Sequence, residues 1–254
     1  MEIRTVNAMR YVTPLREGGS LPAIIEGDDD GLYVLKFRGA GQGIKALIAE
    51  LLGGEIARFL GLKVPEIVYV NLDATMARTE PDPEIQDLIK ASGGLNLALD
   101  YLPGSITFDA LIEKPSAEIA SKIVWLDAFT ANVDRTPRNA NMLLWHKELW
   151  LIDHGAAFFY HHNWEKFPDN ASNPFKQIKD HILLPFAENI AEADEDFSKK
   201  LTPEVLREIV GSIPDDWLEN EAENRETYFR FLTERLKNRK EFVGEAINAR
   251  KLLV

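Results

Sequence analysis

The sequence predicts an α+β fold of two lobes, a β-rich N-terminal lobe and a helical C-terminal lobe. Runs that alternate apolar and polar residues, the pattern of strands, are concentrated before residue 103. Runs whose apolar residues recur every three to four positions, the pattern of helices, dominate after residue 116, with one hairpin-like segment among them. We therefore expect one lobe over residues 1–102 and a second over residues 103–254.

The composition excludes several classes of protein and site. The 254 residues are 45% apolar and 28% charged, which is ordinary for a globular protein. A formal charge of −12 disfavours nonspecific binding to nucleic acids and anionic membranes. Without cysteine there are no disulfides, thiolate zinc sites or cysteine nucleophiles. Since no signal peptide or run of ~18 apolar residues is present, we expect a cytoplasmic protein with no membrane partner and no direct nucleic-acid binding.

The chain begins with two expected strands, residues 9–13 and 21–26, on either side of Gly18, Gly19 and Ser20. A glycine-rich turn between strands can present backbone N–H groups to an anion. An ordinary hairpin turn explains the same residues. The turn alone leaves both interpretations open.

The next two segments pair a lysine with a glutamate. A strand over residues 32–37 carries Lys36 on the face opposite its aromatic residues, and a helical pattern over residues 42–60 carries Glu50 and Glu55. A strand lysine followed by a helix glutamate can form an ion pair that directs the lysine toward phosphate oxygens. The alternative is that all three side chains lie on the surface.

The remaining segments follow the same two patterns. The N-terminal lobe is completed by a strand at residues 67–72, a short surface helix within residues 78–93, and a strand that ends at Pro103-Gly104. A helix over residues 116–133 has Ser116 as its N-cap. Residues 158–175 are aromatic and irregular, as expected of a lid or substrate-binding loop. Further helices are expected at residues 182–191, 202–210 and 221–253.

The residues that point to chemistry gather around the hairpin, whose expected strands are residues 141–145 and 148–152. Asp134 and Asn139, five positions apart, precede the hairpin, and Asp153 follows it. Phosphoryl transfer needs one carboxylate beside the nucleophile, and a second carboxylate with a side-chain carbonyl as hard oxygen ligands for Mg²⁺. The alternative is a polar turn with a buried aspartate that caps a helix.

The order D-x-x-x-x-N, hairpin, D-x-G resembles the catalytic and magnesium loops of the protein-kinase-like superfamily. DRTPRN at residues 134–139 and IDHG at residues 152–155 are most similar to HipA-like and phosphoinositide-type kinases. The glycine turn, the lysine and the helix glutamate stand in the order that a HipA-like kinase has, over roughly residues 12–180. The resemblance implies a two-lobed protein-kinase-like fold and an ATP- and Mg²⁺-dependent phosphotransferase that acts on a hydroxyl, in the first place a protein serine or threonine.

The resemblance also implies a role for each candidate residue. Lys36 would hold the α- and β-phosphates and be oriented by Glu50, which the spacing to LGLKVP favours over Glu55. Asp134 would position the acceptor hydroxyl, and Arg135 beside it would neutralise charge or contact the acceptor. The phosphate-binding turn would be Gly18, Gly19 and Ser20, the adenine-binding hinge Asp100, Tyr101 and Leu102, and the metal ligands Asn139 and Asp153, with Asn141 as the substitute for Asn139.

Three departures from the family pattern limit what is carried over. The glycine turn lacks a basic residue, His154 replaces the aromatic residue that is common after the metal-binding aspartate, and no small domain precedes the N-terminal lobe, so a toxin–antitoxin association is not implied. Two alternatives share the same residues: a nucleotide-binding sensor that transfers nothing, and an enzyme that transfers AMP to a protein hydroxyl. A small-molecule alcohol is an alternative acceptor.

Overall fold

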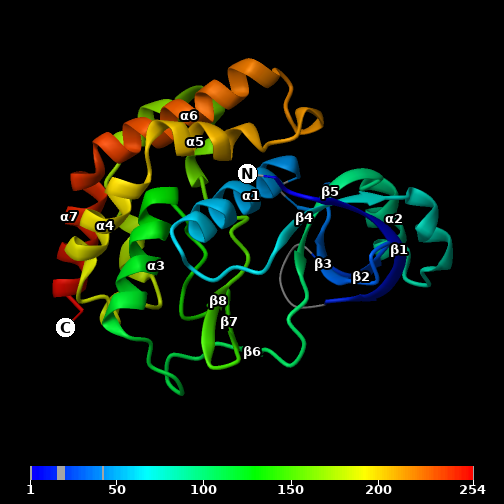
Figure 1. Cartoon of the computed structure of the whole chain (residues 1–254), viewed down its shortest axis with the longest axis horizontal. Helices are drawn as coiled ribbons and strands as arrows, with labels where there is room; N and C mark the ends of the chain where they lie inside the picture. The colour runs from blue at the N-terminus through cyan, green and yellow to red at the C-terminus, as the bar shows by residue number, and fades with distance from the viewer. Residues whose placement is uncertain (1, 16–20, 42, 254) are drawn as a thin grey trace.

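The computed structural model describes residues 2–15, 21–41 and 43–253. The strand-rich N-terminal part and the helical C-terminal part confirm the predicted α+β class (Figure 1). The expected phosphate-binding turn, Gly18 to Ser20, lies outside the described residues. Among the described residues, no helix is both long enough and apolar enough to cross a membrane.

The N-terminal part is a closed five-stranded barrel in the order β1-β2-β3-β5-β4. Its interior is filled by apolar side chains from all five strands, which form a core of their own. The strands are β1 (Thr5–Pro14), β2 (Ala23–Gly27), β3 (Leu32–Lys36), β4 (Ile67–Leu72) and β5 (Gly94–Asp100). Between β4 and β5 lie the 3-10 helix η1 (Ala74–Thr79) and the helix α2 (Pro83–Ala91).

The first strand begins four residues earlier than predicted. Residues 5–7 pair in parallel with residues 69–71 of β4, and this pairing closes the barrel. Because the two segments are more than 60 residues apart in the chain, no local pattern indicates the contact. The predicted strands at residues 21–26, 32–37 and 67–72 are confirmed.

The helix α1 (Ile44–Phe59) lies between the barrel and the C-terminal helices (Figure 1). Every residue from Leu47 to Ala57 is buried, because one face contacts β4 and β5 and another contacts the helix α5 (Pro203–Gly211) of the C-terminal part. The chain leaves this helix through Gly61, whose φ of 84° suits glycine. A helix buried all round is a rigid support for the side chains that it carries.

The C-terminal part is built around α3 (Ala117–Thr130), which is almost entirely buried. The side chain of Ser116 accepts a hydrogen bond from the N–H of Ile119 at 3.2 Å, so the predicted N-cap is confirmed. The predicted hairpin is also confirmed, as β7 (Met142–Trp145) and β8 (Glu148–Leu151), and β6 (Ile106–Thr107) adds a third strand. The two residues that connect β7 to β8, His146 and Lys147, both have positive φ, the geometry of a two-residue type I′ turn.

Two helix predictions in the C-terminal part are wrong. The helix expected at residues 182–191 is α4 (Ile190–Lys200), because the preceding backbone forms the 3-10 turn η6 (Leu184–Phe186) and directs its N–H groups elsewhere. The long helix expected at residues 221–253 is interrupted at Asn238, giving α6 (Glu221–Lys237) and α7 (Arg239–Lys251). The backbone N–H of Asn238 donates to the carbonyl of Glu234 at 3.0 Å, and its side-chain Nδ2 donates to the same carbonyl at 2.8 Å, so Asn238 caps the end of α6.

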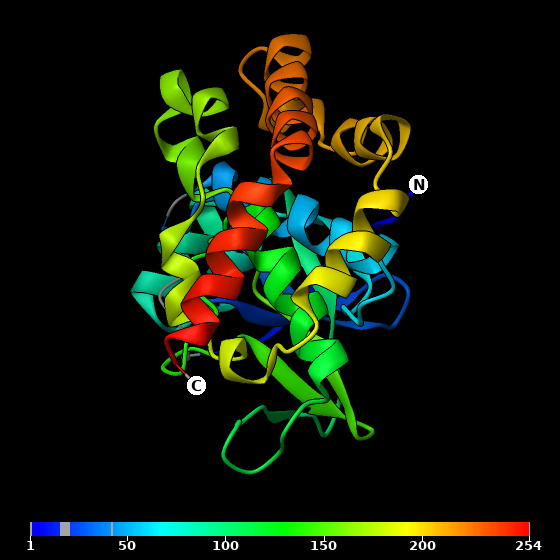
Figure 2. The same cartoon turned by 90° about the vertical axis from the view of Figure 1, so that its left-hand side faces the viewer.

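The break at Asn238 lets α7 pack against both α3 and α4 (Figure 2). The helix predicted at residues 202–210 is confirmed as α5 (Pro203–Gly211), capped by Thr202 and followed by η7 (Asp215–Trp217). The aromatic segment after the hairpin contains only 3-10 turns, and stacking of Phe167 on Phe231 with 4.3 Å between ring centroids joins it to α6. These turns are η2 (Phe159–His162), η3 (Trp164–Lys166), η4 (Pro168–Ser172) and η5 (Lys176–Asp180).

Candidate active site

Lys36 lies between two carboxylates that come from different parts of the chain. Its Nζ is 2.8 Å from Oδ1 of Asp153 and 3.7 Å from Oε2 of Glu50. Burial alone would lower the pKa of Lys36, but the negative charges of Glu50 and Asp153 outweigh burial and raise it. The ammonium group is therefore charged at neutral pH and is fixed where β3, α1 and the segment after β8 meet.

The two glutamates of α1 have different partners. Burial would raise the pKa of Glu50, yet the Lys36 charge, with a smaller contribution from His154, holds it well below its usual range. Glu55 instead pairs with Arg58 at 3.0 Å, and burial raises its pKa. The structure thus brings Glu50, and not Glu55, to Lys36.

His154 replaces the expected aromatic residue and is fully buried against α1. Its Nδ1 is 3.7 Å from Oε1 of Glu50, too far for a hydrogen bond. A Cβ on Gly53 of α1 would lie 2.9 Å from the Cβ of His154. Gly53 therefore allows the segment that carries Asp153 to approach α1 closely.

We predict that Gly53→Ala lowers both stability and turnover. In a helix interior alanine is favoured over glycine by about 1 kcal/mol, but here the added methyl would collide with the Cβ and ring of the buried His154, and overpacking of this kind costs about 1–3 kcal/mol. The control is Gly244→Ala in α7, where a Cβ meets nothing within 4 Å. Thermal unfolding should show a lower Tm for Gly53→Ala and a higher one for Gly244→Ala; a higher Tm for both would contradict the packing argument.

The loop before the hairpin surrounds Asp134 with amide groups. The Nδ2 of Asn139 donates to Oδ2 of Asp134 at 2.8 Å, and the Nδ2 of Asn141 donates to the Asp134 carbonyl at 3.0 Å and to its Oδ2 at 3.2 Å. Thr136 and Asn139 exchange two backbone hydrogen bonds, which close the turn around Pro137. Both asparagine side chains therefore orient Asp134, and among the described residues neither Oδ1 accepts a hydrogen bond.

Asp153 follows β8 in a left-handed backbone conformation, with a φ of 57°. Such a conformation costs about 1–3 kcal/mol in a residue other than glycine and is frequent at functional sites. The N–H of Ile152 donates to the carbonyl of Asn141 at 3.1 Å, which fixes Asp153 relative to the loop of Asp134. The Asp153 side chain is 38% exposed and accessible to a ligand.

These residues fit a magnesium ion by the chemistry of their donors. The Asp153 carboxylate and the free amide oxygens of Asn139 and Asn141 are hard oxygen donors, the type that Mg²⁺ binds. The described residues contain no cluster of three or more histidine, aspartate or glutamate side chains that would bind a metal ion. A small donor set is what Mg²⁺ uses when it also binds phosphate oxygens.

The expected adenine-binding segment offers fewer groups than the sequence implies. The N–H of Asp100 donates to the Glu66 carbonyl at 2.8 Å, and the N–H of Tyr101 donates to the Leu32 carbonyl at 2.9 Å. Both donors are thus occupied by barrel contacts, because β5 lies between two other strands. Of the three N–H groups, only that of Leu102 makes no hydrogen bond among the described residues.

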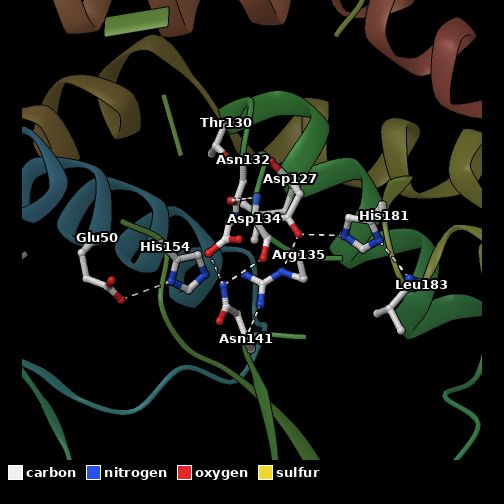
Figure 3. A network of polar contacts seen from close by, with 11 residues as sticks. Glu50, Asp127, Thr130, Asn132, Asp134, Arg135, Asn141, His154, His181 and Leu183 are labelled. Carbon is white, nitrogen blue, oxygen red and sulfur yellow. Dashed lines mark hydrogen bonds and ion pairs between the residues drawn. The ribbon is translucent and has the colours of Figure 1, made fainter. Parts of the chain in front are cut away.

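A buried polar cluster beside the loop of Asp134 was not predicted from the sequence (Figure 3). Asp127 of α3 contacts Asn132, Arg135 and His181, and all four side chains are buried. Arg135 is 1% exposed, so the suggestion that it contacts the acceptor is wrong. The available signal was Asp127 itself, a charged residue within the apolar stretch of a predicted buried helix.

One hollow in the described surface lies away from these residues. It has a volume of about 320 Å³, and its lining includes Phe108, Lys114 and, from the hairpin, Leu149. None of the candidate site residues lines it. The chemistry is therefore assigned from the polar groups and not from cavity size.

Comparisons with known proteins agree with this geometry. A family model for HipA-like kinases matches residues 9–243. The structure is similar to the crystal structure of the proinflammatory kinase CtkA of Helicobacter pylori, with a TM-score of 0.59, 14% identity, and coverage of 98% of this chain and 100% of the other. It is also similar to the Golgi casein kinase with Mn/ADP bound, with a TM-score of 0.52, 14% identity, and coverage of 99% and 74%. No curated protein matches the sequence.

Proposed function

Because the chain belongs to the HipA-like kinase family, we propose that it transfers the γ-phosphate of ATP to a hydroxyl group in a Mg²⁺-dependent reaction. The family and the fold support a kinase-type phosphotransferase. The acceptor that we propose is a serine or threonine of a protein, since a side-chain hydroxyl is the group that Asp134 is suited to orient.

One observation carries the proposal: Lys36 is fixed between Glu50 and Asp153. A lysine that is held by a buried glutamate and also contacts the candidate metal ligand is the arrangement that binds nucleotide phosphates in kinases. A salt bridge that only stabilised the fold would not need an aspartate in a strained backbone conformation on the accessible side.

Each residue then has a separate task. Lys36 binds the α- and β-phosphates, and Glu50 holds its ammonium group in place. Asp153, with Asn139 or Asn141, holds Mg²⁺, which when bound neutralises charge on the phosphate oxygens. Asp134 accepts a hydrogen bond from the acceptor hydroxyl and directs its oxygen toward the γ-phosphorus; the bond from phosphorus to the bridging oxygen breaks, ADP leaves, and Asp134 takes the proton.

We predict that Lys36→Met and Glu50→Gln are strongly non-additive. If Glu50 acts only by orienting Lys36, the double variant loses no more kcat/KM than Lys36→Met alone, because the second change removes a partner that is already lost. Glu55→Gln is the control, since Glu55 pairs with Arg58. Losses that simply add on a logarithmic scale would show that the two residues act independently.

Labelled ATP tests the proposed reaction directly. The protein is incubated with a cell lysate and Mg²⁺, in parallel with ATP labelled in the γ-phosphate and ATP labelled in the α-phosphate. We expect protein-bound label from the γ-phosphate alone. Label from the α-phosphate would show AMP transfer instead, and label from neither, with ATP bound, would show a sensor.

A further inference from the structure

We propose that Asp127 is a positioning residue, which keeps the carboxylates of Asp134 and Asp153 in a fixed relation by holding the loops that carry them. The inference rests on the proposed function. It concerns a side chain with no exposed surface, which acts through other residues and not on the substrates.

Asp127 joins three segments that are separate in the chain. Its Oδ1 accepts from Nδ2 of Asn132 at 3.0 Å, and its Oδ2 accepts from Nε of Arg135 at 2.5 Å and pairs with Nε2 of His181 at 2.9 Å. Removing a carboxylate from water is costly unless its oxygens are paired and hydrogen-bonded. Burial would raise the pKa of Asp127, but the Arg135 charge and the His181 hydrogen bond hold it well below its usual range.

Two of these contacts fix the backbone of Asp134 from both sides. The N–H of Asp134 donates to Oδ1 of Asn132 at 3.1 Å, while Nδ2 of the same side chain donates to Asp127. Arg135 follows Asp134 directly and is held by Asp127 through its Nε. The position of the Asp134 carboxylate therefore depends on Asp127 through both neighbours.

Arg135 also connects Asp127 to the backbone beside Asp153, the candidate metal ligand. Its Nη1 donates to the carbonyl of Asn141, and the same carbonyl accepts from the N–H of Ile152, the residue before Asp153. A guanidinium can bond two acceptors at once in a fixed plane, which a lysine ammonium at the same position cannot reproduce. One side chain thus ties the loop of Asp134 to the backbone that leads to Asp153.

His181 connects the segment around residues 181–183, which follows Asp153 in the chain, to Asp127. The N–H of Leu183 donates to Nδ1 of His181, so in the neutral ring the proton is on Nε2 and is donated to Asp127. Burial lowers the pKa of His181 despite the nearby carboxylate, which favours this neutral form. The N–H of Ile182 donates to the Arg135 carbonyl at 3.0 Å, a second connection between the same two segments.

Asp127→Asn, Arg135→Lys and the double variant test the proposal. We expect each single change to lower kcat by ~10²-fold, the effect of a misplacement of about 1 Å, and to leave the KM for Mg–ATP within about threefold of wild type. The double variant should lose no more than the worse single variant, because both changes break the same connection. The readout is transfer from γ-labelled ATP, corrected for the folded fraction of each protein.

The matched control is a second aspartate–arginine pair of the C-terminal part. Asp194 accepts from Nε1 of Trp125 at 2.9 Å and from Nε of Arg239 at 3.1 Å, remote from the catalytic loop. Asp194→Asn and Arg239→Lys should lower Tm and leave kcat unchanged. A purely structural role for Asp127 predicts the same for its variants, and that result would overturn the proposal.

The proposal can still be tested if the Asp127→Asn variant fails to fold. Arg135→Lys keeps the buried charge pair with Asp127, so it remains informative if Asp127→Asn does not fold, and a wild-type kcat in this variant would overturn the proposal. A wild-type protein that transfers no label would overturn the proposed function, and the positioning role with it. The two failures are therefore distinguishable.

Discussion

Asp153→Asn is expected to abolish phosphate transfer in a protein that stays folded. The change removes the negative charge of Asp153 and keeps the size of its side chain, which is 38% exposed. Lys36 remains paired with Glu50 when this charge is lost. The loss should be on the order of 10³-fold or more, the scale at which removal of a charged group at the transferring phosphate acts.

Nucleotide affinity shows whether Asp153 acts through the metal. Calorimetric titration with ATP should give weaker binding than wild type in the presence of Mg²⁺, and nearly wild-type binding without it. Asp87→Asn is the control, because it removes a carboxylate from another lysine–aspartate pair, with Lys90 on α2. Unaltered turnover in purified Asp153→Asn would contradict the assignment.

Asp134→Ala separates an enzyme from a sensor. A phosphotransferase needs this carboxylate beside the acceptor oxygen, whereas Lys36, Glu50 and Asp153 make no contact with it among the described hydrogen bonds and ion pairs. We therefore expect turnover to fall by ~10²-fold or more while the affinity for Mg–ATP changes by only a few-fold.

Two other results would have different meanings. If binding is lost together with turnover, Asp134 is a metal ligand or a structural group, and the tasks given to Asp134, Asn139 and Asn141 are wrong. If neither changes, the protein does not use this carboxylate for transfer. Circular dichroism of the variant shows in either case whether the loop change has affected the fold.

The parts of the fold that local chemistry determines were predictable from the sequence. Ser116 and Thr202 indicated helix starts, and alternating apolar residues indicated the strand that carries Lys36. The hairpin was predicted from two short apolar runs separated by His146-Lys147. These features depend on interactions between residues that are close in the chain.

The features that were missed depend on contacts between distant segments. The parallel pairing of β1 with β4 closes the barrel. The interruption at Asn238 allows α7 to pack against α3 and α4. The adenine-binding role of Asp100, Tyr101 and Leu102 stays a prediction, and the sequence did not show that the N–H groups of Asp100 and Tyr101 donate to the carbonyls of Glu66 and Leu32. Only the folded chain shows where such donors are directed.

Only part of the candidate site could be selected from the sequence, because some of its residues are joined by contacts between segments that are distant in the chain. Order and spacing were enough to select Lys36, Asp134 and Asp153. The cluster around Asp127 joins α3 to a histidine 54 residues later, and a single aspartate in a buried helix does not reveal that partner. A charged residue within an otherwise apolar helix is nevertheless a feature that can be searched for in other sequences.

The proposed chemistry is tested most directly by a single-turnover transfer of γ-labelled phosphate, with wild type, Asp134→Ala and Asp153→Asn measured side by side at saturating Mg–ATP. We predict transfer by wild type, a rate lower by ~10²-fold or more for Asp134→Ala, and none detectable for Asp153→Asn. Equal rates for all three folded proteins would contradict the assignment of this site as the centre of phosphate transfer.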